Sequence, residues 1–352
     1  MAPLEELLQA YSQAGWLYTK TETGAVNCQA CGHNCLIQPG QRGICQMRIN
    51  EDGILMVPWG YVAALNVDPI EKKPLMHFLP GSSALTFGML GCNFHCDFCQ
   101  NWISSQAMRD PNAASAVNYM QEIEPQELVD YAQRSGAASI VSSYNEPLIT
   151  SEWAIEIFRL ARGHKLRTAY VSNGFATPEV MNALQPVLDA FKVDLKCMTD
   201  EKYRELGGRL GVVKDTIQRS FEMGFWVEVV TLIVPGFNDS NAELEDMANF
   251  LAGVSVDIPW HVTAYYPTYK RQRGVRTGAN ALQRAASIGQ EAGLRYVYAG
   301  NLPGRVGPLE NTYCPRCEKL LVGRSGYSIL ENHITADGTC PVCGETIAGV
   351  WK

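Results

Sequence analysis

The sequence predicts an α/β protein built around a partial (βα)6-type barrel, open and TIM-like, with fewer strands than a complete barrel. Short apolar runs rich in β-branched residues alternate with amphipathic stretches from residue 81 to residue 303. About six or seven such units fit into roughly 220 residues, whereas a full eight-fold barrel typically needs about 250. Cysteines gather before and after this repeating region, in a leader and in a tail.

These flanks divide the chain into three expected domains. Residues 1–80 form an N-terminal cysteine-containing extension, residues 81–303 the partial barrel, and residues 304–352 a C-terminal metal-binding tail. The alternating pattern breaks near Gly304, and the short apolar pieces that follow are too few to fold without a metal. The chain has 352 residues, 46% of them apolar, which suffices for one large core with small satellite domains.

Each element follows from its local pattern. A short helix is expected at the start, where Leu4, Leu7, Leu8 and Tyr11 recur at helical spacing. Proline and glycine turn signals make residues 68–82 a loop. The barrel elements are expected in this order: strand 83–90, helix 124–136, strand 138–147, helix 151–165, strand 167–174, a helical segment, strand 190–196, helix 211–224, strand 225–236, a helix after Asp239, strand 260–267, a further helix and strand 294–301. Such alternation implies parallel pairing, which brings the carboxyl ends of the strands to one edge.

Charge and hydropathy argue against two classes of partner. The chain has 36 acidic and 29 basic residues, a net charge of −7, and no run rich in lysine or arginine. Broad binding to nucleic acid or to an anionic membrane is therefore not expected. No apolar run reaches the roughly 20 residues of a membrane helix, and the first residues lack the pattern of a signal peptide. We expect a cytoplasmic protein.

Eleven of the twelve cysteines fall into three tight clusters, which indicates metal binding. A disulfide framework is the alternative, but it suits short secreted chains. Spacings of two or three residues let neighbouring thiolates converge on one centre. Cys197 stands alone after a strand. A lone buried cysteine usually acts as a small apolar side chain, and a functional thiol is the alternative.

The stretch Gly91–Asn101, GCNFHCDFCQN, carries Cys92, Cys96 and Cys99 in a C-x3-C-x2-C pattern. Three cysteines in one loop can hold three corners of a cubane [4Fe–4S] cluster, and the fourth iron then has no protein ligand. An open coordination position is where a substrate or cofactor binds. The alternative is a zinc knuckle with a distant fourth ligand such as His95 or Cys197, but structural zinc rarely follows a first barrel strand.

This CxxxCxxC loop, with an aromatic residue before its last cysteine, resembles that of the radical S-adenosylmethionine (SAM) superfamily. The resemblance implies that SAM chelates the free iron, and that the reduced cluster cleaves SAM to methionine and a 5′-deoxyadenosyl radical that abstracts hydrogen from a substrate. It also implies a SAM contact for Glu146, in a stretch where the superfamily usually has Gly-Gly-Glu and this chain has Tyr144 and Asn145 instead of the glycines. The other SAM contacts that it implies lie at the ends of the third and fourth strands: Ser172, Asn173, Asp194 and Lys196.

Within that superfamily the chain resembles pyruvate formate-lyase activating enzymes and, more closely, the radical SAM component of the AmmeMemoRadiSam system. The shared motifs include VAALNVDPIEKKPLMHFLPGS, GCNFHCDFCQNW, SYNEP, VEVVTLIVPGFNDS and the closing CPVCGETIAGVW. The resemblance implies a protein or small-molecule substrate, Memo-like and AMMECR-like partners, and an electron donor such as flavodoxin or ferredoxin. The alternative function is a non-catalytic iron–sulfur and zinc scaffold that docks partner proteins.

The two outer clusters each offer four thiolates, which can close a tetrahedral zinc site or bind iron. Zinc is the expected metal at both, with a second iron–sulfur cluster as the alternative for the first and a rubredoxin-like iron for the second. His33 is expected to be a solvent-facing loop residue, with replacement of one cysteine as a ligand the alternative. Lys72 and Lys73 are expected in a solvated loop, with a substrate-entry or partner role the alternative that the resemblance implies. The first cluster is Cys28, Cys31, Cys35 and Cys45, and the second, zinc-ribbon-like, is Cys314, Cys317, Cys340 and Cys343.

Overall fold

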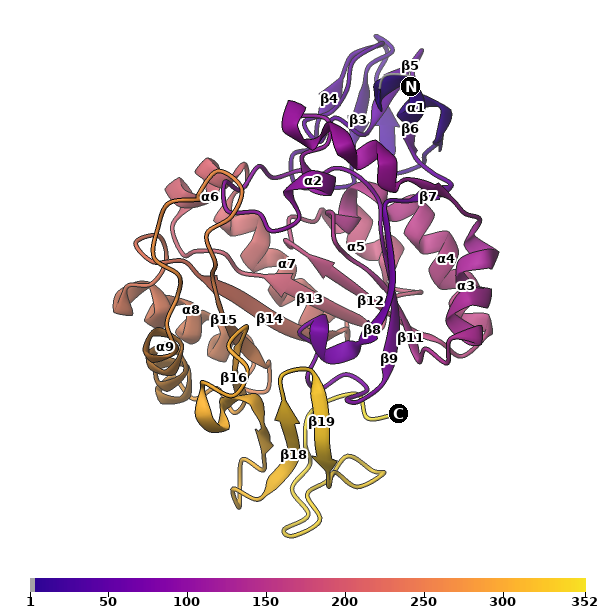
Figure 1. Ribbon diagram of the computed structural model, residues 1–352. Helices are drawn as coiled ribbons and strands as arrows, with labels where there is room; N and C mark the ends of the chain where they lie inside the picture. Colours follow the sequence, from indigo (N-terminus) through magenta and orange to yellow (C-terminus); the bar gives the residue numbers. More distant parts are fainter. Residues whose placement is uncertain (1–3) are drawn as a thin grey trace. The chain divides into compact units, whose positions relative to one another are not determined.

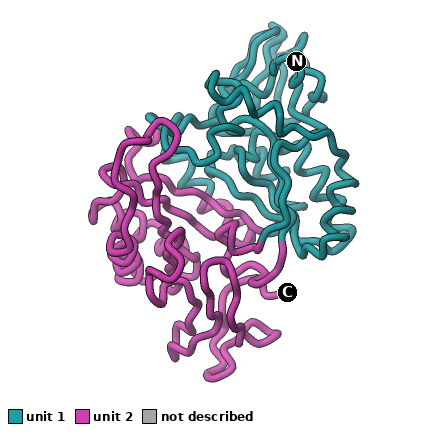
Figure 2. Tube along the Cα trace, viewed as in Figure 1, with its two compact units in different colours: residues 1–68, 84–189, 204–216 teal, residues 69–83, 190–203, 217–352 magenta. Residues whose placement is uncertain are grey.

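The predicted alternation of parallel strands and crossover helices is present, and the α/β class is confirmed. The computed structural model describes residues 4–352. Figure 1 shows its helices and strands, and Figure 2 shows the two compact units into which the chain divides. Unit 1 comprises the chain up to residue 68 with residues 84–189 and 204–216, and unit 2 comprises residues 69–83, 190–203 and 217–352.

Unit 1 contains the first parallel strands and the N-terminal region. Its strands β9 (Ser83–Gly88), β11 (Ser139–Ser142) and β12 (Arg167–Ser172) pair in parallel, and Ser139 lies opposite both Ala84 and Arg167. The α-helices of this unit are α1 (Leu4–Ala10), α2 (Trp102–Ser105), α3 (Pro125–Arg134), α4 (Ser151–Gly163) and α5 (Pro178–Leu184).

The N-terminal region is built from short antiparallel strands that the sequence pattern did not reveal. One sheet has the order β1-β6-β5, a second β2-β3-β4, and β7 pairs with β10. The bounds are β1 (Ser12–Ala14), β2 (Tyr18–Lys20), β3 (Val26–Cys28), β4 (Leu36–Ile37), β5 (Ile49–Glu51), β6 (Ile54–Pro58), β7 (Tyr61–Val62), β8 (Ala64–Pro69) and β10 (Gln121–Glu122). Two 3-10 helices, Pro111–Tyr119 and Pro147–Thr150, complete unit 1.

Helix α4 shows how apolar spacing fixes the core of unit 1. Its buried side chains recur at the three- and four-residue spacing of one helix face, and they include Trp153, Ala154, Ile157, Phe158 and Ala161. The ring of Phe87 on β9 lies 5.4 Å from that of Trp153, and Phe158 lies 5.6 Å from Tyr170 on β12. Helix α4 therefore fixes the positions of β9 and β12, whose carboxyl ends bear the candidate site.

Unit 2 contains the later strands and the C-terminal tail. Strands β13 (Ala190–Asp194), β14 (Trp226–Ile233), β15 (Trp260–Ala264) and β16 (Val297–Gly300) pair in parallel in this order. Helices α8 (Asn241–Val254) and α9 (Ala279–Glu291) pack together, and α9 lies on β15 and β16. Helices α6 (Asp200–Leu206) and α7 (Leu210–Glu222) contain residues of both units.

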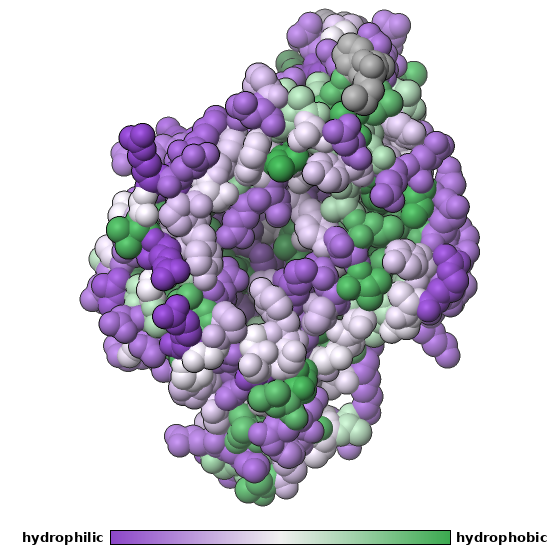
Figure 3. Space-filling view, viewed as in Figure 1, coloured by the Kyte–Doolittle hydropathy of each residue, from purple (hydrophilic) through white to green (hydrophobic). Residues whose placement is uncertain are grey.

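The tail is a three-stranded antiparallel sheet of β17 (Thr312–Tyr313), β18 (Leu320–Ser325) and β19 (Ser328–Asn332), preceded by the 3-10 helix Gly307–Glu310. Figure 3 shows apolar residues at the surface of the tail, where Leu330 and Val342 are about two-thirds exposed, at 69% and 65%. No helix between residues 4 and 352 has both the length and the apolar character needed to cross a lipid bilayer.

The segment after β8 is not the solvated loop that the sequence suggests. It contains a 3-10 helix, Ile70–Lys72, and Lys73 and His77 are buried, at 3% and 0% exposure. The expectation of a solvated Lys73 is therefore wrong. Apolar neighbours such as Leu75 and Phe78, both 0% exposed, bury the segment in the core of unit 2.

Candidate functional site

The cysteine loop follows β9, as the sequence predicts. Burial raises the pKa of Cys92 well above its ordinary value, and the nearby charges of Glu146, Cys96 and Cys99 raise it further. The loop begins at Gly91, whose φ of 91° favours glycine. A Cβ atom there would lie 2.2 Å from Cγ of Met47, so the N-terminal region packs directly on the turn.

Polar hydrogens surround the sulfur atoms of this loop. The backbone N–H of Phe94 donates to Cys92 Sγ at 3.3 Å, and Ser105 Oγ lies 3.3 Å from Cys99 Sγ. Hydrogen bonds to cysteine sulfurs stabilise thiolates and tune the potentials of iron–sulfur clusters. Three thiols with these donors, in a loop whose Phe94 and Phe98 are buried, fit a cluster held by three protein ligands.

Glu146, Ser172 and Asn173, predicted from the ends of different strands, do meet. The Glu146 carboxylate, only 2% exposed, accepts hydrogen bonds from Ser172 Oγ at 2.6 Å and from the backbone N–H of Asn173 at 2.8 Å. The N–H of Leu148 donates to the same carboxylate at 3.1 Å. Asn173 continues to the cysteine loop, since its Nδ2 atom donates to Asn93 Oδ1 at 2.7 Å.

Tyr144 occupies a backbone conformation that usually belongs to glycine. Its φ is 69°, in the left-handed region, at a position where the resembled superfamily usually has glycine. The phenol holds this conformation, because its OH donates to Asp68 at 3.1 Å and accepts from Asn66 at 3.2 Å. Glycine at position 88 leaves room for this tyrosine, because a Cβ atom on Gly88 would lie 2.8 Å from Cβ of Tyr144. The tyrosine thus keeps a glycine-like turn before Glu146.

Asp194 and Lys196 belong to unit 2, at the end of β13. Asp194 pairs with Lys192 and, at 3.2 Å, with Lys196 Nζ. Burial alone would raise the pKa of Asp194, but the two lysines outweigh it and the pKa is lowered. Asn238 donates to the Lys196 carbonyl at 2.7 Å and the Tyr203 OH meets the Lys196 N–H at 2.9 Å, so the backbone here is firmly held.

The N-terminal cysteines lie beside the central loop in unit 1. Cys28, Cys31 and Cys45 are buried, and Cys35 is half-buried. Burial raises the pKa of Cys31, and the charges of Cys28 and Cys45 raise it further. The thiol of Cys35 receives the Ile44 N–H at 3.5 Å.

Asn93 and His33 connect the two cysteine groups, a link that sequence reasoning missed. His33 Nε2 donates to the carbonyl of Asn93 at 3.0 Å, and the His33 ring meets Phe175 edge-on at 4.9 Å. The expectation of a solvent-facing His33 is wrong, because it is half-buried. The Asn93 side chain lies near Cys31 and favours its thiolate, opposing the effect of burial on that pKa.

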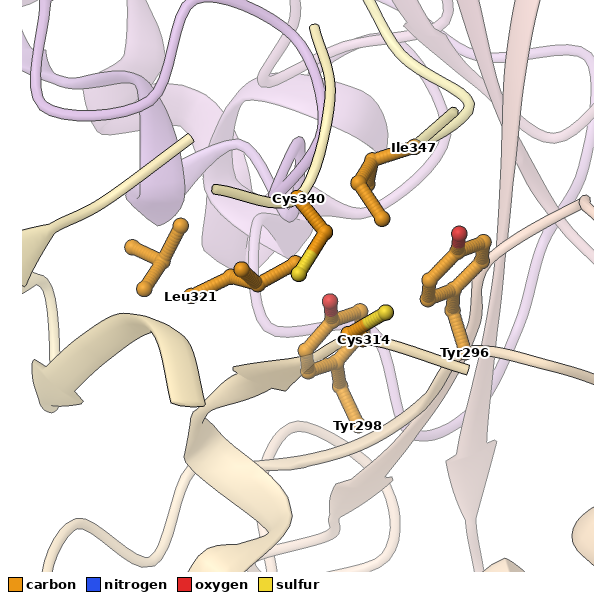
Figure 4. Close-up of a cluster of buried hydrophobic side chains, with 7 residues drawn as sticks. Tyr296, Tyr298, Cys314, Leu321, Cys340 and Ile347 are labelled. Carbon is orange, nitrogen blue, oxygen red and sulfur yellow. The ribbon is translucent and has the colours of Figure 1, made fainter. Parts of the chain in front are cut away.

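The C-terminal cysteines form a metal-ready group. Their four Sγ atoms lie within 4.8 Å of one another, with Cys314 and Cys343 at 3.6 Å and Cys317 and Cys340 also at 3.6 Å. Four sulfurs each about 2.3 Å from a tetrahedral zinc ion would lie about 3.8 Å apart. Figure 4 shows that Cys314 and Cys340 sit among apolar side chains, namely Tyr296, Tyr298, Leu321 and Ile347.

Two residues weighed as alternative zinc ligands have other surroundings. His95 is exposed, and its backbone N–H donates to the Leu206 carbonyl at 2.9 Å in unit 1. Cys197, in unit 2, is buried with Sγ 3.7 Å from the Thr199 carbonyl, and burial raises its pKa to about 12. A thiol with that pKa is protonated at neutral pH, which agrees with its interpretation as a small apolar side chain.

A buried polar network in unit 2 was also missed. The carboxylate of Glu228 on β14, 0% exposed, accepts from His261 Nε2 at 2.6 Å and from the N–H of His77 at 2.8 Å. His77 Nδ1 donates to the Ala348 carbonyl at 2.6 Å, so Nε2 accepts from Tyr298 OH at 2.5 Å. The sequence does contain a feature that predicts this network, because Glu228 is a charged residue inside the apolar run VEVV.

Comparisons with known proteins show which proteins this chain is similar to, and over which residues. Residues 87–251 match the family model of the Radical SAM superfamily. An uncharacterized protein of Methanocaldococcus jannaschii is 36% identical over 94% of this chain and 97% of its own length. That similarity therefore includes the cysteine-bearing extension and tail as well as the strands between them.

Two further similarities are partial. The isethionate sulfite-lyase activating enzyme of Oleidesulfovibrio alaskensis is 27% identical over 47% of this chain, and this chain spans 54% of the length of that enzyme. A domain of a pyruvate-formate lyase-activating enzyme from Bacteroides vulgatus superposes with a TM-score of 0.41 and 16% identity, over 47% of this chain and 100% of that one.

Proposed function

Because this chain belongs to the radical SAM superfamily, we propose that Cys92, Cys96 and Cys99 bind a [4Fe–4S] cluster and that the protein uses SAM to start hydrogen abstraction. Membership implies radical SAM chemistry, with the cluster and SAM as cofactors. The observation that carries the proposal is that Asn173 links the cysteine loop to Glu146 in unit 1, since its backbone N–H donates to the Glu146 carboxylate at 2.8 Å and its Nδ2 atom donates to Cys92 Sγ at 4.0 Å. When bound, the cluster and SAM supply a 5′-deoxyadenosyl radical, which removes hydrogen from the substrate.

The proposed role of the protein residues is to bind and orient SAM and to exclude water from it. Three thiolates leave one coordination position open for the amino and carboxylate groups of SAM. Glu146 is the proposed partner of the SAM amino group, and its carboxylate is held in place by hydrogen bonds from Leu148, Ser172 and Asn173. The buried side chains of Phe94 and Phe98 would exclude water from the cluster.

Lys196 is the proposed partner of the SAM carboxylate. Its ammonium group is held by Asp194, and a lysine so oriented attracts a second carboxylate as a point charge. Ser172 and Asn173 complete the proposed SAM contacts, because their side chains already bind Glu146 and Asn93 at the end of β12.

We propose a protein as the substrate. Several relatives carry the names of activating enzymes, including the isethionate sulfite-lyase and benzylsuccinate synthase activating enzymes. An activating enzyme acts on another protein, so a partner protein that receives a radical is the parallel for this chain. The proposal includes a low-potential electron donor of the flavodoxin or ferredoxin type, and Memo-like and AMMECR-like proteins as partners.

The test is anaerobic SAM cleavage. The protein is reconstituted with iron and sulfide, reduced, mixed with SAM and assayed for 5′-deoxyadenosine, beside Cys96→Ala and the control Cys197→Ala. We expect product from the wild type and from Cys197→Ala and none from Cys96→Ala. A loaded wild-type cluster that neither cleaves SAM nor changes its electron paramagnetic resonance (EPR) spectrum on SAM addition would reject the enzyme in favour of the scaffold.

A further inference from the structure

The N-terminal cysteine group has features that a purely structural metal site does not need. From its contacts with the central loop, we propose that Cys28, Cys31, Cys35 and Cys45 hold a second iron–sulfur cluster that passes single electrons to the cluster at Cys92, Cys96 and Cys99. The electron acceptor in this relay is the cluster at Cys92, Cys96 and Cys99, so the relay rests on the proposed function. The presence of the second cluster does not depend on that function.

The first feature is a short path between the two groups. Asn93 follows Cys92 in the chain, and its carbonyl accepts a hydrogen bond at 3.0 Å from His33, which lies two residues from Cys31 and from Cys35. An electron leaving a cluster at Cys31 therefore has covalent bonds to His33, one hydrogen bond to the Asn93 carbonyl and then covalent bonds to Cys92. Electron tunnelling falls steeply with distance and favours bonded paths over gaps. Such a path is of use only if both sites are redox-active, and zinc is not.

The second feature is a fixed spacing. His33 lies between Cys31 and Cys35 and donates to the Asn93 carbonyl at 3.0 Å. A Cβ atom on Gly32 would lie 2.7 Å from Val212 and 3.1 Å from Phe175, so this loop is tightly packed in unit 1. The hydrogen bond from His33 to the Asn93 carbonyl therefore joins two closely packed cysteine loops.

The third feature is a pair of buried N–H donors. Within residues 4–352, Asn93 Nδ2 and Arg48 Nε have no partner that meets hydrogen-bond geometry, although both residues are at most 1% exposed. Asn93 is joined to the N-terminal cysteine loop through its hydrogen bond with His33, and Arg48 follows Cys45 by three residues. A cluster adds inorganic sulfides to the cysteine sulfurs as acceptors, and so accounts for both donors.

The fourth feature is a pocket with a basic side chain in its wall. A pocket of about 280 Å³ in unit 1 is lined in part by Gly32, His33, Asn34 and Arg209, so it carries a positive charge beside the N-terminal cysteine loop. An acidic one-electron carrier protein fits this charge. It would be oxidised by one electron, the N-terminal cluster would be reduced and reoxidised, and the central cluster would keep the electron, with no bond made or broken.

The experiment removes the central cluster and asks whether iron remains. We expect the triple variant Cys92→Ala/Cys96→Ala/Cys99→Ala, reconstituted anaerobically, to keep about four iron atoms and to show an EPR signal after reduction. Adding Cys31→Ala to the triple variant should abolish both the bound iron and the EPR signal. Adding Cys343→Ala instead, as a control in the tail, should leave the iron content and the EPR signal intact. Zinc in the N-terminal site with no cluster signal after reconstitution of the triple variant would overturn the proposal.

A second measurement uses the wild type and does not depend on the triple variant folding. If the path through His33 and Asn93 joins the two clusters, their spins should broaden each other when both are reduced, so that the EPR spectrum differs from the sum of the separate signals. The broadening should disappear in Cys31→Ala. An unbroadened sum would overturn the relay even where two clusters are present. An EPR signal in the triple variant, together with the absence of any cluster in Cys31→Ala, would mean that only the N-terminal cysteines bind a cluster. That outcome would reject the proposed function and leave the second cluster standing.

Discussion

Arg48 and Glu152 form a buried ion pair between the N-terminal region and helix α4. Guanidinium NH1 and NH2 of Arg48 donate to the two oxygens of Glu152 at 2.9 and 2.5 Å, and the residues are 1% and 2% exposed. Glu152 also accepts from the N–H of Leu17 at 3.2 Å, and Arg48 NH1 donates to the Ile149 carbonyl at 3.2 Å. These contacts fasten the cysteine-bearing extension to the barrel helix within unit 1.

Removing one partner of this pair should therefore be costly. Arg48→Met leaves the Glu152 carboxylate buried and uncompensated, which we expect to lower the free energy of unfolding by about 3–5 kcal/mol. Arg159→Met is the matched control, because its pair with Glu156 is exposed and should contribute less than about 1 kcal/mol. Urea unfolding of both variants measures the difference. Equal losses of unfolding free energy in the two variants would show that the buried ion pair contributes no more to stability than the exposed one.

Glu146→Gln tests the proposed SAM contact. The amide keeps the shape of the side chain but loses the charge, and one hydrogen bond to a charged group is worth about 1.5–3 kcal/mol. We expect SAM to bind about 10- to 100-fold more weakly, by calorimetry on the reconstituted protein, with the iron content unchanged. The exposed Glu156→Gln is the control. Unaltered SAM affinity in Glu146→Gln would remove this residue from the proposed site.

His77 should make the protein sensitive to mild acid. Burial lowers the pKa of His77 to about 4, and the charge of Glu228 only partly opposes this. The unfolded chain protonates this histidine near pH 6.5, so between pH 6.5 and 4 the unfolded state binds more protons. The stability present above pH 6.5 is then lost as the pH falls, by about 3 kcal/mol in all.

The pH dependence has a second contributor with the same sign. Burial would raise the pKa of Glu228, but the hydrogen bond and charge of His261 lower it below its ordinary value. This carboxylate also loses its stabilising effect as the pH falls. Denaturant unfolding across pH 4–7 should show a shallower slope in His77→Gln than in the wild type. The exposed His164→Gln should keep the wild-type slope, and an identical slope in His77→Gln would contradict the assignment.

Loss of the tail metal should loosen the core of unit 2. Tyr296, Tyr298 and Leu321 pack against Cys314 and Cys340, so opening the four-cysteine group exposes apolar surface. We expect Cys343→Ala to lose one metal ion per chain by elemental analysis, to change its near-ultraviolet circular dichroism and to unfold at a lower temperature. Cys197→Ala should keep the metal. A retained metal in Cys343→Ala would exclude this ligand set.

Much of the site could be predicted because parallel strands place their carboxyl ends at one edge. Glu146 after β11 and Ser172 and Asn173 after β12 are separated by 26 residues or more in the chain, yet they meet as expected. The spacing of the cysteines likewise indicated the loop and the tail group. In these cases the pattern is local and the fold supplies the remaining geometry.

The missed features depend on distant pairs that leave no local pattern. Arg48 and Glu152 lie 104 residues apart, and each has the ordinary sequence context of a surface charge. The N-terminal strands are two to six residues long, too short for an alternating burial pattern to stand out. His77 lies in a segment whose prolines indicate a loop, and only its apolar neighbours hint at burial.

The packing of Met47 on Gly91 limits how this chain can be recombined with its relatives. A crossover placed between the extension and the cysteine loop would join a methionine from one parent to a glycine turn from another, at a point where no extra atom fits. A functional chimera must therefore take residues 28–48 and residues 91–101 from the same parent. Helix α4 must travel with them, because it carries the partner of Arg48.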